Sequence, residues 1–322
     1  MRPDSKIYVA GHRGLVGSAL MRQLQARGCH NLVTRSHAEL DLTEQAAVRD
    51  LFAAEKPEYV LLAAAKVGGI HANNTYPAEF IRQNLAIQTN VIHEAWRGNV
   101  KRLLFLGSSC IYPRDCPQPI REEYLLTGPL EPTNRPYALA KIAGVEMCWA
   151  YNRQYGTKYI AAMPTNSYGP GDNYDLANSH VLPALIRKMH EAKQRGDKQM
   201  VVWGTGMPRR EFIYSDDMAE ACVYLLEQPE AKLQGLFSGT QPPLVNVGCG
   251  EDLSIRELAE LVRKIVGFTG QLVFDAAKPD GTMRKLLDVG KLNALGWEAH
   301  TRLNDGIAQA YTDYLEHAGG SA

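Results

Sequence analysis

Short apolar runs alternate with longer amphipathic segments through the first half of the chain. The apolar runs, which predict β-strands, are residues 6–10, 31–34, 59–64, 102–106 and 159–163. The amphipathic segments, which predict helices, are residues 18–27, 44–55, 77–98 and 137–155. Because the apolar runs are continuous rather than alternating, we expect their strands to be buried on both faces. The pattern predicts an α/β fold with a doubly wound parallel sheet of the Rossmann type.

The regular alternation stops after Pro164. Residues 165–180 are rich in Asn, Gly, Pro, Tyr and Asp, which is typical of a functional loop. Ordered segments then return, with predicted helices at 217–227 and 254–266 and a predicted strand at 244–247. The chain is therefore expected to form two domains. They are a Rossmann domain of residues 1–165 and 211–248, and a smaller C-terminal domain of residues 166–210 and 249–322.

A glycine-rich turn directly follows the first predicted strand and opens the first predicted helix. Glycine lets the backbone turn tightly and approach a pyrophosphate closely, and a helix N-terminus offers free N–H groups and a positive dipole end. The spacing GxxGxxG in this position predicts a dinucleotide-binding site, although a glycine triplet alone could be an ordinary turn. The predicted contacts are Gly11, His12, Arg13, Gly14, Leu15, Val16 and Gly17.

The segment after the second predicted strand bears on which dinucleotide binds. NAD-binding proteins usually carry an acidic residue there, but here residues 34–37 read TRSH. Arg13 and Arg35 can instead meet a 2′-phosphate, because a guanidinium matches phosphate geometry. The alternative is that Arg35 is a solvated surface residue. We favour NADP(H) as the cofactor, with Asp41 and Leu42 flanking the adenine.

Tyr137 and Lys141 form a YxxxK pair on a predicted helix. Residues four apart share a helix face, so the phenol and the ammonium lie together. The lysine and a nicotinamide cation favour the phenolate, which can exchange a proton with a sugar oxygen while hydride moves to or from carbon. Ser108 follows a buried strand and can hydrogen-bond the same oxygen, since ligand sites form at the carboxyl ends of parallel strands. By itself YxxxK is frequent by chance, and such a pair could lie at the surface.

Together these motifs resemble the extended short-chain dehydrogenase/reductase family, in which members of this branch act on nucleotide sugars. The resemblance covers essentially the whole chain. A finer resemblance is to the enzymes that epimerise GDP-4-keto-6-deoxy-D-mannose at C3 and C5 and reduce C4 with NADPH, giving GDP-L-fucose. The matching segments are residues 11–14, 64–70, 107–113, 164–166, 178–180, 203–204, 210–212 and 278–282.

The resemblance implies roles for five side chains. Ser108, Tyr137 and Lys141 would form a reductase triad, Cys110 would be the base of epimerisation, and His180 would be the acid. The chemistry agrees, because a C4 ketone acidifies the hydrogens on C3 and C5, and Ser108 and Tyr137 can stabilise the developing oxyanion. A thiol and an imidazole also have suitable pKa ranges for this work. The alternatives are that Cys110 is a buried apolar residue and that His180 makes only structural hydrogen bonds.

The resemblance also implies contacts with both ligands. Further cofactor-binding residues would be His37, Leu106, Gly107, Ser108, Ser109, Lys141, Pro164, Thr165, Asn166, Ser167 and His180. The smaller domain would bind the GDP-sugar substrate through Lys188, Trp203, Arg210 and Asp280. Lys188 stands where the family often has arginine, so its phosphate contact would be a point charge rather than a fork. His37 also stands where relatives can carry arginine, and a neutral histidine would weaken the preference for NADPH.

The composition narrows the range of partners. Lysine plus arginine and aspartate plus glutamate balance at 35 each, which gives no reason to expect nucleic acid or an acidic membrane. Apolar stretches such as residues 59–65 are too short to span a bilayer, and the first residues lack the apolar core of a secretory signal. The six cysteines form no CxxC pair, which favours reduced thiols and no metal site. We therefore expect a cytoplasmic protein.

The resemblance finally bears on assembly and on other functions. Family members often dimerise through two helices of each subunit, which implies a homodimer with a four-helix bundle built from residues 77–98 and 137–155. A different nucleotide-sugar epimerase, reductase or dehydratase is one alternative, although residues 108–110 lack the carboxylate pair that is common in dehydratases. A non-catalytic NADPH-binding sensor is another. Such proteins commonly lose the tyrosine or lysine of YxxxK, and both are present here.

Overall fold

The computed structural model describes residues 1–176, 178–238, 240–278 and 280–318 of the chain. Pro279, which belongs to the 278–282 segment of the resemblance, lies outside these residues. The last four residues of the expected smaller domain, 319–322, also lie outside them.

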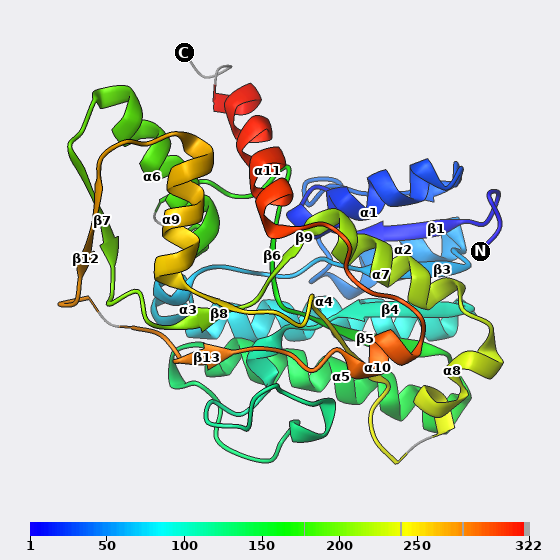
Figure 1. Cartoon of the computed structure of the whole chain (residues 1–322). Helices are drawn as coiled ribbons and strands as arrows, with labels where there is room; N and C mark the ends of the chain where they lie inside the picture. Colours follow the sequence, from blue (N-terminus) through cyan, green and yellow to red (C-terminus); the bar gives the residue numbers. More distant parts are fainter. Residues whose placement is uncertain (177, 239, 279, 319–322) are drawn as a thin grey trace.

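Six parallel strands form the central sheet, in the order β2–β1–β3–β4–β5–β10 (Figure 1). They are β1 (Ile7–Ala10), β2 (Leu32–Val33), β3 (Tyr59–Leu62), β4 (Arg102–Leu106), β5 (Tyr159–Pro164) and β10 (Leu244–Val247). The order of the strands reverses at β1, because β2 lies on one side of it and β3 on the other. In open α/β sheets, ligands bind outside the carboxyl ends of the strands at such a point.

Helices cover both faces of this sheet, as the continuous apolar runs predict. On one face, α1 (Leu15–Ala26) packs beside α7 (Ser215–Glu227), and their apolar side chains meet Ile7 and Val9 of β1. The opposite face is covered by α2 (Gln45–Glu55), α4 (Pro77–Arg97) and α5 (Arg135–Tyr155). Tyr8 of β1 points to that second face, where its ring meets Phe52 edge-on at 5.9 Å between centroids. Alternate strand residues thus pack in two separate cores, one on each face of the sheet. The predicted doubly wound α/β fold is confirmed.

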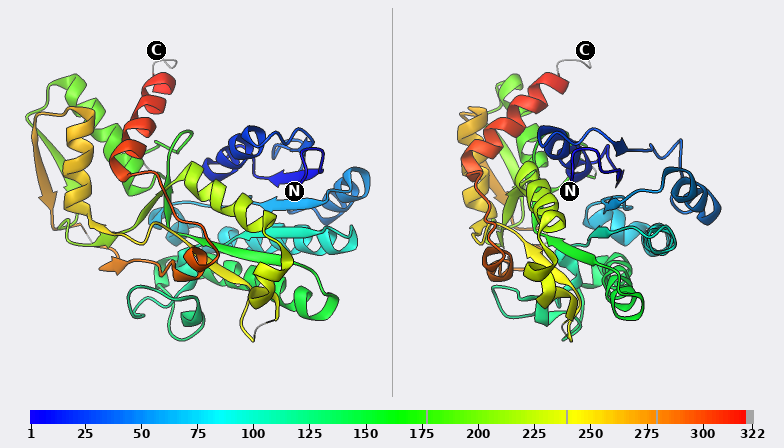
Figure 2. Two further views of the ribbon diagram at one scale, coloured as in Figure 1. Left: turned by 45° about the vertical axis from the view of Figure 1, so that its right-hand side comes forward. Right: turned by 90° about the vertical axis from the view of Figure 1, so that its right-hand side faces the viewer.

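A third buried cluster lies beside the sheet (Figure 2). Its helices are α6 (Val181–Arg195), α9 (Ile255–Val266) and α11 (Leu303–Ala318). The small sheets around it pair β7 (Gln199–Trp203) with β12 (Gln271–Asp275), and β6 (Asn166–Tyr168) with β9 (Phe212–Tyr214). A third small sheet has the order β11–β8–β13, formed by β11 (Leu253–Ser254), β8 (Arg209–Arg210) and β13 (Arg284–Lys285).

The three buried clusters cross the predicted domain boundaries. Phe212 and Tyr214 pack in the third cluster, although residues 211–248 are expected in the Rossmann domain. Leu292 and Trp297 pack with α1 and α7, although residues after 248 are expected in the smaller domain. The division of the chain into two domains stays a prediction.

Several elements have no counterpart in the predicted pattern. Within the expected loop 165–180 the structure has β6, and α6 begins at the residue after that loop. The remaining short helices are α3 (Ile70–Thr75), α8 (Glu230–Ser238) and α10 (Gly290–Ala294). Single turns of 3₁₀ helix are Ser109–Ile111, Glu122–Tyr124 and Pro132–Asn134. These turns lie near the carboxyl end of β4 and in the segment that leads from it to α5.

Candidate active site

The glycine turn joins β1 to α1 with a fit that a side chain would disturb. Gly11 has φ +86°, and a Cβ atom built on it would lie 2.6 Å from the backbone nitrogen of Ala64. A Cβ atom on Gly17 would lie 1.9 Å from the carbonyl oxygen of Gly11. Gly14 precedes α1 and no side chain caps the helix, so its first N–H groups point outward for an anionic ligand. These features fit the pyrophosphate of a dinucleotide.

The side chains expected at the adenosine end are partly engaged with other protein groups. Arg35 donates to a carboxylate oxygen of Glu55 at 2.6 Å and to the carbonyl of Thr34 at 2.7 Å. Asp41 accepts hydrogen bonds from the backbone and hydroxyl of Thr43, at 2.9 and 2.8 Å. Leu42 is buried in the core under α2 and α4. Of the predicted contacts here, Arg13 and His37 are the exposed ones.

Glu39 is an acidic residue of this region that the sequence pattern did not single out. Its carboxylate accepts from the backbone and the hydroxyl of Ser36, both at 2.6 Å. These hydrogen bonds lower the pKa of Glu39, and the charges of Arg13 and Arg35 lower it further. Glu39 therefore lies close enough to both arginines for their charges to act on its carboxylate.

The YxxxK pair lies at the carboxyl end of β4, on the first turns of α5. The ammonium of Lys141 is buried, donates to the carbonyl of Leu106 at 2.7 Å, and lies 5.8 Å from the centre of the Tyr137 ring. Burial lowers the pKa of Lys141 to about 8. Burial raises the pKa of Tyr137, the nearby Cys110 adds to this, and a hydrogen bond with Ser108 opposes it. The structure therefore brings the predicted hydroxyl, phenol and ammonium together.

Cys110 lies in the 3₁₀ turn that follows β4. Ser108 caps this turn, and its hydroxyl oxygen accepts from the backbone N–H of Cys110 at 3.4 Å. Cys110 is only 7% exposed, and burial raises the pKa of its thiol. The charge of Lys285 is the largest influence that opposes this rise. Cys110 and Lys285 both line a cavity of about 20 Å³, which has room for about one water molecule.

His180 is the residue immediately before α6, where its backbone is extended. The loop after β3 runs beside its segment, since a Cβ atom on Gly69 would lie 3.6 Å from the carbonyl of Asn178. The same loop reaches Tyr137 through Phe80, because a Cβ atom on Gly68 would lie 3.1 Å from the Phe80 ring. The Phe80 ring in turn meets the Tyr137 ring edge-on at 6.1 Å. The imidazole keeps solvent contact, yet the surrounding protein lowers its pKa by desolvation.

Two predicted cofactor contacts use their side chains to hold the protein itself. The hydroxyl of Thr165 and the amide of Asn166 both donate to the carbonyl of Glu211, at 3.2 and 2.8 Å. The buried carboxylate of Glu211 accepts from the backbone N–H groups of Gly250 and Leu287, at 2.8 and 3.0 Å. Glu211 therefore ties together the chain after β5, β10 and β13. Glu211 lies in the 210–212 segment that carries the family resemblance, but nothing in the sequence indicates this structural role.

The predicted substrate contacts gather around the small sheets. Trp203 is 64% exposed, and the ammonium groups of Lys188 and Lys278 lie 4.8 and 5.3 Å from its ring centre. Arg210 donates to the carbonyl of Thr282 at 2.5 Å. Burial lowers the pKa of Arg210, and the negative charge of Asp280 opposes this. An open aromatic face flanked by cations suits a base and its phosphates. Lys278 belongs to a matched segment, but the sequence did not single it out.

Asp280 is engaged with the loop that follows β7. Its two carboxylate oxygens accept from the backbone N–H of Thr205 at 3.0 Å and from the Thr205 hydroxyl at 2.6 Å. Thr205 comes two residues after Trp203, so this contact joins the 278–282 segment to the end of β7. A sugar or ribose hydroxyl would have to share the carboxylate with Thr205.

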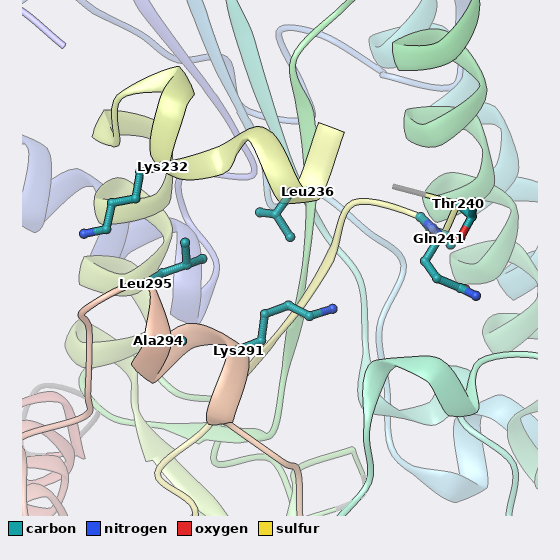
Figure 3. Close-up of a pocket in the computed structure, with 9 residues that line it drawn as sticks. Lys232, Leu236, Thr240, Gln241, Lys291, Ala294 and Leu295 are labelled. Atoms are coloured by element: carbon teal, nitrogen blue, oxygen red, sulfur yellow. The ribbon is translucent and has the colours of Figure 1, made fainter. Parts of the chain in front are cut away.

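A larger cavity, of about 420 Å³, lies away from this region (Figure 3). It is lined by α8, the chain before β10, and α10, with Lys232, Leu236, Lys291 and Leu295 among its side chains. Both lysines have protein partners, since Lys232 donates to the Tyr224 hydroxyl and Lys291 to the carbonyl of Leu244. Within the described ranges no helix could cross a membrane, and no cluster of three metal-binding side chains occurs.

Comparison with known proteins assigns the family. Residues 7–248 match the model of the NAD dependent epimerase/dehydratase family. The chain is 59% identical to GDP-L-fucose synthase 1 of Arabidopsis thaliana over 314 residues, which cover 98% of this chain and 94% of the relative. It is 54% identical to GDP-L-fucose synthase of Escherichia coli K12, with 97% of each chain covered.

Solved structures resemble the chain over nearly its whole length. A GDP-mannoheptose C4 reductase from Campylobacter jejuni with NADP bound is 44% identical, with a TM-score of 0.89 over 98% of this chain and 99% of that one. A GDP-L-fucose synthetase from Naegleria fowleri bound to NADP is 28% identical, with a TM-score of 0.87 over 99% and 95%. The resemblance to extended short-chain dehydrogenases/reductases is confirmed, and the chain belongs to the NAD dependent epimerase/dehydratase family.

Proposed function

We propose that this protein converts GDP-4-keto-6-deoxy-D-mannose to GDP-L-fucose, by epimerisation at C3 and C5 and reduction at C4 with NADPH. The observation that carries the proposal is the gathering of Cys110 with Ser108, Tyr137 and Lys141 at the carboxyl end of β4. A plain ketone reductase needs only the last three side chains. The names of the Arabidopsis and Escherichia coli relatives support the same reaction.

Reduction would use the triad as a proton donor to the sugar. NADPH supplies hydride to C4 when it is bound. The Tyr137 phenol then gives its proton to the C4 oxygen, while the Ser108 hydroxyl holds that oxygen by a hydrogen bond. The Lys141 ammonium, fixed by the carbonyl of Leu106, stabilises the phenolate that remains.

Epimerisation would use Cys110 and His180 on opposite faces of the sugar ring. The Cys110 thiolate takes the proton from C3 or C5, and the electrons move to the C4 oxygen to form an enolate. Ser108 and Tyr137, which already hold that oxygen, stabilise its charge. His180 then returns a proton from the other face. Its imidazole must first be charged to do so, and desolvation lowers its pKa, so acid catalysis by His180 favours the acidic side of neutrality.

Cofactor and substrate would meet at the carboxyl edge of the sheet. We propose that the N-terminus of α1 binds the pyrophosphate of NADP(H) and that exposed Arg13 meets the 2′-phosphate. Arg35 would join Arg13 by exchanging its ion pair with Glu55. The GDP moiety would lie against Trp203, with Lys188 at a phosphate. The Campylobacter jejuni and Naegleria fowleri structures both hold NADP, which supports this choice of cofactor.

The test combines the substrate, NADPH and deuterated water. Loss of NADPH absorbance with deuterium at both C3 and C5 of the product would support the epimerase–reductase. Loss of NADPH without deuterium would refute epimerisation and leave a plain reductase, as the similar Campylobacter jejuni C4 reductase is named. No loss of NADPH would refute reduction and favour an epimerase acting on another nucleotide sugar.

We also propose a homodimer that packs α4 and α5 of each subunit into a four-helix bundle. These helices lie side by side, and the sulfur of Met147 on α5 lies 3.7 Å from the hydroxyl of exposed Thr89 on α4. Aromatic side chains extend this outer face, where Trp96 stacks on Tyr155 at 4.3 Å. The change Thr89→Arg should shift sedimentation from dimer to monomer. A wild-type protein that sediments as a monomer would refute the dimer.

Two further expectations complete the proposal. We propose that residues 1–165 and 211–248 form the cofactor-binding domain, and that residues 166–210 and 249–322 form the substrate-binding domain. The third buried cluster, built on α6, α9 and α11, supports a separate core for the second. We propose a cytoplasmic location, which the six free thiols of the chain support because such thiols persist in reducing compartments.

A further inference from the structure

Lys285 lies opposite Cys110 although the two residues are far apart in sequence. It belongs to β13, which pairs in parallel with β8 so that Lys285 stands next to Arg210. Its neighbour Arg284 donates to the carboxylate of Asp252 at 2.5 Å. Both residues line the cavity that Cys110 also lines, but Arg284 is held by Asp252, and Lys285 is the one whose charge acts on the Cys110 thiol.

The surroundings of Lys285 leave its charge incompletely balanced. Burial lowers the pKa of Lys285, and the nearby Arg210 lowers it further, whereas Cys110, Cys116 and Glu131 oppose this. The Glu131 carboxylate lies 3.9 Å from the guanidinium of Arg114, with which it forms an ion pair. A cation that is largely removed from water is stabilised by an anion close to it.

The surroundings of Cys110 have the complementary need. Besides Lys285, the groups that face its sulfur are the Lys141 ammonium, the Ser108 hydroxyl and the Tyr137 phenol. Lys141 already donates to the carbonyl of Leu106 and lies near the Tyr137 ring. In the proposed reduction it stabilises the Tyr137 phenolate. Of the two ammonium groups that act on the Cys110 thiol, Lys285 is the one that does not belong to the reductase triad. A buried thiol becomes a thiolate only where a cation or a hydrogen bond stabilises the negative charge.

We infer that Lys285 is a positioning residue that increases the fraction of Cys110 present as the thiolate for epimerisation. This inference rests on the proposed function of Cys110 as a base. In the step that it assists, the C–H bond at C3 or C5 breaks and an S–H bond forms at Cys110. The electron pair of the C–H bond becomes the C=C bond of the enolate, and the π pair of the C4 carbonyl moves to its oxygen, so the negative charge passes from sulfur to the enolate. Lys285 acts before this transfer, by increasing the fraction of the base that is ready.

The test is a pH titration of the ultraviolet absorbance of the Cys110 thiolate, without substrate. Each curve is corrected by subtracting that of the same protein with Cys110→Ser. Lys285→Met should reduce the thiolate fraction at a fixed pH below the midpoint by about tenfold, because a neighbouring cation shifts such a pKa by about one unit or more. Lys285→Arg keeps the charge and should restore most of the fraction. Lys264→Met removes an exposed cation on α9 and should leave the thiolate titration unchanged.

Two outcomes decide the inference, and neither depends on overall activity. Titration curves that coincide for wild type and Lys285→Met would overturn it. If circular dichroism shows that Lys285→Met is unfolded, Lys285→Gln provides the second neutral variant for the same comparison. Deuterium exchange at C3 and C5 by the wild type is measured in parallel. A shifted titration without exchange would overturn the proposed epimerisation alone, whereas exchange with an unshifted titration would overturn the role of Lys285 alone.

Discussion

Gly17 provides the sharpest test of the dinucleotide turn. The change Gly17→Ala places a methyl group 1.9 Å from the carbonyl oxygen of Gly11 and 2.7 Å from its carbonyl carbon. Both atoms belong to the backbone, which cannot swing aside as a flexible side chain can. Gly11 itself is held by its positive φ and by its close approach to Ala64, which comes two residues after β3. We therefore expect α1 to move away from β1.

The size of the effect follows from this geometry. Adding a methyl group to a packed site typically costs about 1–3 kcal/mol, and the upper end applies because the obstacle is backbone. A loss of about 3 kcal/mol should lower the Tm of the ligand-free protein by several degrees. NADPH affinity should fall at least about tenfold, since displacing the N-terminus of α1 by a fraction of an ångström spoils its hydrogen bonds to the pyrophosphate. Thermal unfolding and fluorescence titration with NADPH measure the two effects separately.

Gly14→Ala is the matched control within the same turn. Its methyl group would meet only the Gly11 oxygen, at 3.5 Å, which is an ordinary contact, and its φ of −77° suits alanine. The Tm of the ligand-free protein should therefore stay close to that of the wild type. If Gly17→Ala were as stable as Gly14→Ala and bound NADPH normally, the close approach of α1 to β1 would be wrong.

Three further predictions concern catalysis and stability. Cys110→Ser should abolish deuterium incorporation at C3 and C5 while an already epimerised ketone is still reduced, and equal loss of both steps would contradict the assigned base. Reduction should slow as pH rises through about 8, where the Lys141 ammonium loses its proton; a kcat profile that is flat across this pH would count against that role. Asp252→Asn should cost about 1 kcal/mol in urea unfolding, because its partners Arg209 and Arg284 remain half exposed. Burial raises the pKa of Asp252, but the hydrogen bonds from its two arginines outweigh burial and lower it. The stability that Asp252 contributes should therefore be lost as pH falls through that lowered pKa. If the free energy of unfolding of the wild type and of the variant fell identically at acid pH, this prediction would be refuted.

The central sheet could be predicted from the sequence because its strands are buried on both faces. A continuous apolar run such as Tyr59–Leu62 has no polar side to expose to solvent, so it is recognised as a strand buried on both faces. The helices between these strands each have one apolar face, which makes them recognisable too. The smaller elements carry weaker signals. The strand β7 has only five residues and only every second one is buried, so it contains no continuous apolar run by which it could be recognised. The helix α6 begins directly after a loop rich in turn-forming residues, without a side-chain cap to mark its start.

The site divides in the same way between local and distant information. Ser108, Tyr137 and Lys141 could be predicted because each lies at a recognisable place, after a buried strand or on one face of a helix. Arg35 shows the limit of this reasoning, since its ion pair with Glu55 depends on where the end of α2 lies. Lys285 shows it more clearly, because nothing near it in sequence marks it as functional. Its place at the cavity of Cys110 is set by the pairing of β13 with β8. Arg284 lines the same cavity but is held by Asp252, so Lys285 is the basic residue of the two whose charge acts on the thiol.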